Sequence, residues 1–260
     1  MQRKENKIQT IFRQWATTLL GLGICLGLGT GASAMTLDLE SPTIQISTFY
    51  NGTTLKVRGD MPVGADLLVT LSGPKKNVAL KVKGKVAGFL WMNKDDVELE
   101  NIPAVYMVYT GGNVSCDLPS IGVGYQALID DIDIKPADAD KKFVFAEYVK
   151  LMEKSGLYMM RQGAVKYAST GTGEKTYTLT LQIPPKMSAG DYQVKAIAIQ
   201  DGKIIDQAHQ QLRLVLTGLP KFIATLAFQH SLLFGIMAVL IAVAAGLIIG
   251  FLFKGGGGAH

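Results

Sequence analysis

The chain has 260 residues with 26 basic and 21 acidic side chains, of which four basic and one acidic residue lie in a predicted leader, residues 1–34. The remaining 22 basic and 20 acidic residues make a nearly neutral protein, so its charge gives no reason to expect nucleic-acid binding. Cys25 lies in the leader and Cys116 stands alone, which excludes an intrachain disulfide, a haem attached through Cys-x-x-Cys-His and a zinc cage of thiolates in the mature chain.

Residues 1–34 have the three parts of a secretory signal peptide. A basic start, diluted only by Glu5, precedes an apolar run from Ala16 to Leu28, and small residues then end at Ala34. The apolar run is short for a membrane span, so we predict cleavage after Ala34, with retention as an uncleaved anchor as the alternative. Lipidation at Cys25 is disfavoured because Ile24 stands where the lipoprotein signal peptidase needs a small residue.

The segment 35–219 is predicted to be an exported β domain. Apolar and polar residues alternate in it, as in half-buried strands, near residues 44–46, 55–57, 67–71, 78–82, 89–91, 105–109, 177–183, 192–199 and 204–216. Asn51-Gly52 and Asp201-Gly202 are predicted to form tight hairpin turns, and Gly73-Pro74 to end a strand.

Regularly spaced short strands with glycine and proline turns favour an immunoglobulin-like β-sandwich. Pro184-Pro185 followed by Gly190-Asp191-Tyr192 is typical of the corner that such folds close with a buried tyrosine. Residues 138–155 interrupt the pattern with a helical periodicity, an aspartate as the N-cap and Gly156 as the stop. This helix is either an insertion packed on the sandwich or the boundary between two β subdomains.

Residue groups that could carry chemistry in this domain have simpler explanations. The acidic run beginning at Asp130 has Pro136 and Lys142 where an EF-hand needs glycine and glutamate, so we interpret it as a solvated loop before a helix. The main basic cluster is interpreted as an exposed strand face, because three of its lysines alternate along one strand, with binding of anionic headgroups or an acidic partner as the alternative. Its members are Lys75, Lys76, Lys81, Lys83 and Lys85. Cys116, next to Asp117, has no evident group to lower its pKa, and no Gly-x-Ser-x-Gly elbow is present, so no enzyme is predicted.

The carboxyl end is predicted to cross a membrane within residues 222–253. Ser231 to Phe253 is an uncharged run of 23 residues, or about 34 Å of helix. Residues 254–260 would form a cytoplasmic tail. Small residues recur every fourth position and would let another helix approach closely, namely Ala238, Ala242, Gly246 and Gly250. His230 is interpreted as marking the membrane interface.

The order and spacing of several motifs resemble a known family. They are Ser41-Pro42, Phe49 with Asn51-Gly52, Gly59 with Pro62-x-Gly64-Ala65, Gly73-Pro74, Trp91-Met92-Asn93, Pro103 with Tyr106, Gly190-x-Tyr192 and the span from His230. Over residues 36–253 the chain resembles the putative transmembrane protein family first described in alphaproteobacteria. The resemblance implies an exported single-span protein that accompanies a sulfite-exporter-type anion permease, and it implies no catalytic or binding residue.

Together these observations predict a non-catalytic accessory or assembly subunit of an inner-membrane complex, anchored by one span with its main domain in the periplasm. Its partner would be another membrane protein or a second copy, packed on the small-residue stripe, and no cofactor is expected. The alternative is a periplasmic copper-binding or small-ligand-binding protein, with His209 and methionine thioethers as soft ligands.

Overall fold

The computed structural model of the chain describes residues 35–86, 90–112, 114–169 and 174–253. The predicted leader and cytoplasmic tail lie outside these residues. The strands are β1 Asp38–Leu39, β2 Thr43–Ile46, β3 Thr53–Pro62, β4 Asp66–Ser72, β5 Lys75–Val86, β6 Leu90–Pro103, β7 Tyr106–Gly111, β8 Asp133–Lys135, β9 Tyr158–Ser169, β10 Glu174–Ile183, β11 Gly190–Gln200 and β12 Lys203–Leu216. The helical elements are η1 Pro119–Ile121, α2 Tyr125–Asp131, α3 Lys141–Lys154, α4 Gly218–Gln229 and α5 Ser231–Phe253.

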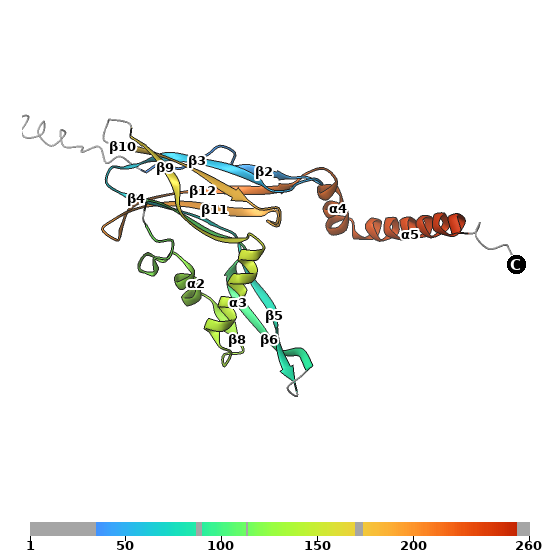
Figure 1. Cartoon of the computed structure of the whole chain (residues 1–260). Helices are drawn as coiled ribbons and strands as arrows, with labels where there is room; N and C mark the ends of the chain where they lie inside the picture. Colours follow the sequence, from blue (N-terminus) through green and yellow to red (C-terminus); the bar gives the residue numbers. More distant parts are fainter. Residues whose placement is uncertain (1–34, 87–89, 113, 170–173, 254–260) are drawn as a thin grey trace, which may run out of the picture. The chain divides into compact units, whose positions relative to one another are not determined.

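Nine strands form one curled sheet in the order β1-β3-β10-β9-β7-β4-β11-β12-β2 (Figure 1). Its two edge strands are consecutive in the chain, because the main chain crosses from one edge to the other at Ser41. The amide of Glu40 donates to the carbonyl of Lys56 on β3 at 3.0 Å, whereas the carbonyl of Pro42 accepts from Arg213 on β12 at 2.8 Å. The curled sheet therefore brings two layers face to face, and β9 belongs to both.

The prediction of a mainly β domain is confirmed, and the pairing is consistent with an immunoglobulin-like arrangement. β2 runs parallel to β12 while β11 pairs antiparallel with both β12 and β4. Tyr192 stands near the start of β11 with 3% of its surface exposed, and its hydroxyl donates to the carbonyl of Ser188 at 2.8 Å. This is the tyrosine corner that such sandwiches use to fix the approach to this strand.

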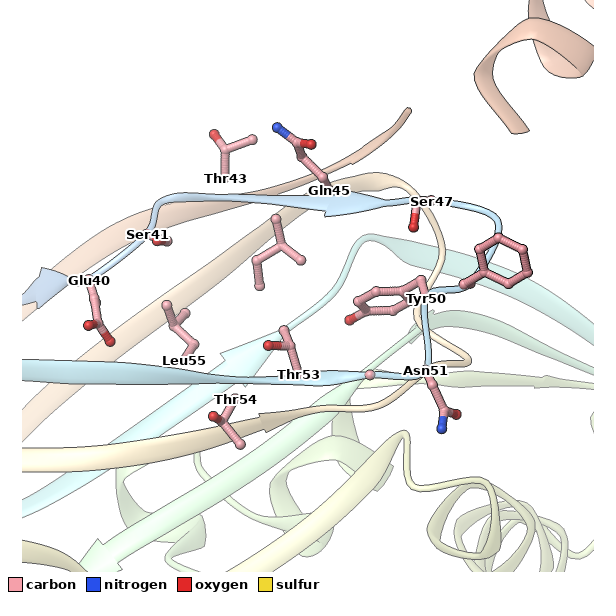
Figure 2. Close-up of a pocket in the computed structure, with 13 residues that line it drawn as sticks. Glu40, Ser41, Thr43, Gln45, Ser47, Tyr50, Asn51, Thr53, Thr54 and Leu55 are labelled. Carbon is pink, nitrogen blue, oxygen red and sulfur yellow. The ribbon is translucent and has the colours of Figure 1, made fainter. Parts of the chain in front are cut away.

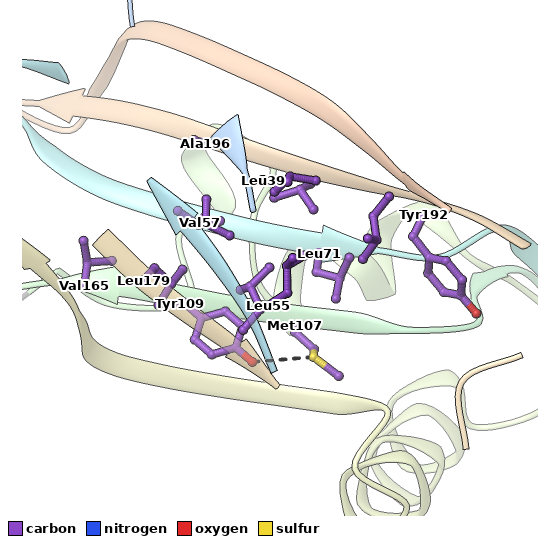
Figure 3. Close-up of a cluster of buried hydrophobic side chains, with 14 of the residues drawn as sticks. Leu39, Leu55, Val57, Leu71, Met107, Tyr109, Val165, Leu179, Tyr192 and Ala196 are labelled. Carbon is purple, nitrogen blue, oxygen red and sulfur yellow. Dashed lines mark hydrogen bonds between the residues drawn. The ribbon is translucent and has the colours of Figure 1, made fainter. Parts of the chain in front are cut away.

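The first core fills the space between the two layers (Figure 3). Alternate residues of β3 point into it, so that Leu55, Val57 and Met61 are buried while their neighbours Lys56 and Arg58 are exposed. β7 supplies Met107 and Tyr109 from the facing layer, both without exposed surface. Burial of each large apolar side chain stabilises the fold by about 1.5–3 kcal/mol, so this core holds the layers together.

A second core lies on the other face of the sheet, under β5, β6, β8, α2 and α3 (Figure 1). The strands predicted near residues 78–82 and 89–91 thus form a separate three-stranded sheet, β5-β6-β8, and are not part of the sandwich layers. The side chain of Asp140 accepts from the amide of Phe143 at 3.1 Å, and Gly156 follows the helix with φ 74°, so the predicted helix and both of its ends are confirmed. The helical segment is packed on the sandwich as one part of this larger insertion.

Four tyrosines join the insertion to the sheet. Tyr158 lies within 6.1 Å, centroid to centroid, of Tyr106, Tyr125 and Tyr148. The hydroxyl of Tyr158 donates to the carbonyl of Pro103 at 2.7 Å, and the Tyr106 hydroxyl accepts from the amide of Gly124 at 2.9 Å. The first hydrogen bond ties β9 to the end of β6 and the second ties β7 to the loop before α2, so the cluster fixes where the insertion sits.

The hairpin predicted at Asn51-Gly52 is wrong, whereas the one at Asp201-Gly202 is confirmed. β2 pairs with β12 and not with β3, so residues 47–52 connect strands of different layers. Gly52 is still required, since it has φ 83° and a Cβ there would come within 2.9 Å of the carbonyl of Ile183. Asp201 and Gly202 have φ 51° and 74°, the left-handed values that a two-residue hairpin loop needs.

Candidate functional site

The clearest functional element is α5, which spans Ser231–Phe253 and coincides with the predicted span. Its 23 residues have a mean hydropathy of 2.9, and none of the apolar window is buried inside the protein. An apolar helix of this length that is exposed on all sides is stable only in a lipid environment or against other apolar helices. The prediction of one carboxyl-terminal membrane helix agrees with this element.

The predicted helix-packing residues Ala238, Ala242, Gly246 and Gly250 all lie on α5. At about 100° per residue, they occupy one side of the helix within about 120°. Gly235 falls on the same side, and a Cβ added at Gly235, Gly246 or Gly250 would meet nothing within 4 Å. The flat face is therefore longer than the four-residue repeat indicated, and nothing in the described chain covers it at its glycines.

The predicted membrane region 222–253 consists of two helices. α4 covers Gly218–Gln229, and His230 separates it from α5 with φ −133° and ψ 51°. Thr217 alone separates α4 from β12, and its amide donates to the carbonyl of Ile46 at the end of β2 at 2.9 Å. Its apolar side chains are exposed or half-buried, with Phe228 exposed at 89%. α4 is therefore a short apolar helix between the β domain and the span, a composition suited to a membrane interface.

His209 and the methionines of the copper hypothesis are not gathered in one place. His209 is exposed on β12, whereas Met61, Met107 and Met187 are buried in the first core. The sulfurs of Met107 and Met159 both accept from the hydroxyl of Tyr109, at 3.6 and 3.7 Å. The described residues hold no cluster of three or more His, Cys, Asp or Glu side chains placed to bind a metal.

Cys116 is buried against the second core, with its sulfur 3.7 Å from the hydroxyl of Thr110. Burial raises the pKa of its thiol above the ordinary value, and the nearby Asp117 acts in the same direction. A raised pKa keeps the thiol protonated at neutral pH, so Cys116 is a poor nucleophile.

The lysine-rich strand is β5, where Lys81 is exposed and forms an ion pair with Asp96 of β6 at 3.1 Å. The side chains of Lys83 and Lys85, and those of Trp91, Met92 and Asn93, lie outside the described part of the structure. The acidic run ends at the cap of α3, where Asp140 bonds Phe143.

A polar slot of about 450 Å³ lies between β2 and β3 (Figure 2). It exists because the chain crosses between the layers at Ser41, which leaves β2 and the start of β3 unpaired with each other. Its carboxylate, Glu40, lies 4.0 Å from the ammonium of Lys56, and its other polar groups are mainly serine, threonine and amide side chains. Its described lining holds one paired charge and no convergent ionisable groups, so we interpret the slot as a consequence of the strand topology and not as a binding site.

A second cavity of about 790 Å³, here called the basic cleft, opens between β9 and β10. Of the lining residues that the structure describes, none is acidic and four are basic: Lys56, Arg58, Arg161 and Lys166. The hydroxyl of Tyr109 lies at the cleft and accepts from the amide of Gln182 at 3.3 Å. Sequence reasoning did not single out any of these residues, because they are far apart in the chain and belong to no motif.

The chain belongs to the family described as Putative transmembrane protein (Alph_Pro_TM), whose model matches residues 34–255. The match begins at the end of the predicted leader and runs past α5, so the β domain and the span belong to one family unit. A search of curated proteins finds no match to the chain.

Proposed function

We propose that this member of the family is a non-catalytic accessory or assembly subunit of an inner-membrane complex. In this proposal the β domain lies in the periplasm and α5 crosses the membrane once. The partner is a multi-span membrane protein, and an anion permease is the first candidate. The β domain docks on the exposed face of the partner while α5 packs against one of its helices.

The observation that carries the proposal is the small-residue face of α5. Small side chains let two helix backbones approach closely, and in lipid this close packing replaces the hydrophobic effect as the source of association. A helix that served purely as an anchor would need apolar residues and no particular face. Gly235, Ala238, Ala242 and Gly246 instead line one side over three turns, which favours a helical partner.

The matched pair Ala242→Leu and Ala244→Leu tests this face. Both substitutions add the same side chain to α5 and leave its apolar character unchanged, but the two positions are about 200° apart around the helix. We expect Ala242→Leu to reduce recovery of the partner, after solubilisation in a mild detergent, by about fivefold or more, because overpacking of a close contact costs about 1–3 kcal/mol. Ala244→Leu should leave recovery unchanged, and equal recovery with both variants would remove the stripe from the proposal.

The proposed topology is tested by labelling introduced cysteines on intact spheroplasts. Lys203 is exposed at the turn between β11 and β12, so Lys203→Cys should react with a membrane-impermeant maleimide while buried Cys116 does not. A cysteine placed at Gly257 in the predicted tail should react only after the membrane is permeabilised. The reverse pattern would place the β domain in the cytoplasm and contradict the proposal.

A further inference from the structure

The basic cleft exists because β9 changes partner along its length. Its first half runs parallel to β7, from Tyr158 to Arg161, and its second half pairs antiparallel with β10 from Lys166 onward. Between these halves the register shifts, and Gly163 adopts φ 69°. β10 continues to Ile183 without β9 beside it, so the sheet is open between Leu179–Gln182 and the first half of β9.

Strand register places cations along the rim of this opening. Arg58 of β3 stands opposite Thr178 of β10, which stands opposite Lys166 of β9. Residues directly opposite in a ladder share a face of the sheet, so these three side chains form a row on the solvent face. Lys56 and Thr180 form the next row on the same face.

Arg161 approaches the same opening from the other layer. It is paired in register with Tyr109 of β7. The side chains of Arg161 and Tyr109 therefore lie on the same face of the sheet, although the Tyr109 ring is buried. The charge of Arg161 acts on the Tyr109 phenol, whose pKa is nevertheless raised overall because burial is the larger effect. Two guanidinium groups and a lysine ammonium therefore line one cavity from two strands, β3 and β9.

Three of these cations have no acidic partner among the described residues. The ion pairs of that part of the chain do not include Arg58, Arg161 or Lys166, and Lys56 is 4.0 Å from Glu40 at the rim. Asp38 of β1 stands opposite Arg58 in the ladder but forms no ion pair with it, and Asp60 in the next row accepts from the hydroxyl of Thr176 at 3.0 Å. Like charges gathered at one cavity repel one another, and an anion between them removes that repulsion.

The rest of the described lining carries no charge. Ala164 is partly exposed, whereas Val57, Leu179 and the ring of Tyr109 are buried in the first core; threonine hydroxyls and the amide of Gln182 provide neutral hydrogen-bonding groups. A volume of about 790 Å³ lies within the range of cavities that hold small organic ligands. Guanidinium groups bind carboxylate, sulfonate and phosphate oxygens with paired hydrogen bonds, which a metal cation or a neutral solute cannot accept in the same way.

We propose that the basic cleft between β9 and β10 binds an organic anion, with its oxyanion group between Arg58, Arg161 and Lys166 and the rest of the molecule over Ala164 and the threonine hydroxyls of β10. The ligand is either a free solute or the headgroup of an anionic lipid, which present the same oxyanion chemistry. This site is separate from the helix-packing face of α5, so either proposal can fail without the other.

Isothermal titration of the full-length protein in an uncharged detergent tests the site. The probes are benzenesulfonate, phenyl phosphate and benzoate, with benzenesulfonamide as a neutral molecule of similar shape. The protein is compared with the double variant Arg58→Gln/Arg161→Gln and with the control Lys186→Gln/Lys203→Gln, which removes two exposed charges outside the cleft. All three proteins should unfold at similar temperatures, because exposed substitutions change stability by about 0.5 kcal/mol or less.

The proposal expects at least one anion to bind with a dissociation constant below about 1 mM, and the cleft variant to weaken it at least about tenfold. The control variant should bind like the unaltered protein, and benzenesulfonamide should not bind. Absence of binding by every anion up to about 10 mM, or equal binding to the cleft and control variants, would overturn the proposal.

Nanodiscs then distinguish the two sources of the ligand. If a lipid headgroup occupies the cleft, phosphatidylglycerol discs should suppress probe binding relative to phosphatidylcholine discs, and this difference should disappear in the cleft variant. If the ligand is a free solute, the probe should bind equally in both discs. Suppression by phosphatidylglycerol that persists in the cleft variant would mean that the lipid acts elsewhere and would contradict the headgroup assignment.

Discussion

Replacement of Tyr192 by phenylalanine removes one hydroxyl group from the corner before β11 and leaves the ring in place. That hydroxyl donates to the carbonyl of Ser188 at 2.8 Å, and the residue is 3% exposed. Loss of a well-formed buried hydrogen bond costs about 1–2 kcal/mol, because the abandoned carbonyl is not fully rehydrated. For a domain of this size each kcal/mol lowers the melting temperature by about 2–4 °C, so we expect a decrease of about 2–8 °C.

Tyr50→Phe is the matched control. The hydroxyl of Tyr50 is 3.5 Å from the carbonyl of Ile183, a distance at which a hydrogen bond contributes little. The same chemical change should therefore lower the melting temperature by less than about 1 °C. Differential scanning fluorimetry of the full-length protein in an uncharged detergent measures both. Equal shifts for the two variants, or none for Tyr192→Phe, would refute the tyrosine corner as a stabilising feature.

Three further predictions concern the β domain. Asp140→Ala should cost about 1 kcal/mol of stability because it removes the N-cap of α3, while Asp138→Ala, an exposed acid before the cap, should be nearly neutral in the same melting assay. Gly111→Ala should cost about 1–3 kcal/mol, since the new methyl group would overlap the hydroxyl of Tyr167, and a melting temperature equal to that of the unaltered protein would contradict this contact. Burial raises the phenol pKa of several core residues, so the folded state keeps their protons longer than the unfolded state does. Their contribution to the free energy of unfolding should be fully present below pH about 10 and fall above that pH by up to about 1.4 kcal/mol per pH unit for each such group. A denaturant midpoint that stays constant from pH about 9 to about 11 would contradict this prediction. These groups include Tyr109, Tyr158 and Tyr177.

The strands of the sandwich could be predicted where one face of a strand is buried and the other is exposed to solvent. β3 and β11 are examples, since their apolar residues alternate with polar ones and identify the inner face. Alternation does not tell which layer a strand joins, which is why β5 and β6 were assigned to the sandwich. β9 was missed altogether because its bulge at Gly163 breaks the alternation in the middle of the strand.

The α5 face and the basic cleft also differ in how far the sequence could predict them. The face of α5 could be predicted because the period of a helix places residues four apart on the same side. Gly235 was overlooked because it lies three residues, and not four, before Ala238. The basic cleft could not be predicted, because only the register of β3, β10 and β9 places Arg58 and Lys166 in one row, on either side of Thr178. Such a site depends on pairing between distant strands, for which the sequence carries no local signal.

The central claim is that the protein is one subunit of an inner-membrane complex. It is tested most directly by affinity purification of the full-length protein from its native membrane in a mild detergent, followed by mass spectrometry and quantification of the components. We predict that a multi-span membrane protein is recovered in stoichiometric amount and that Ala242→Leu, but not Ala244→Leu, depletes it. Recovery of the protein alone, or only with further copies of itself, would contradict the accessory role.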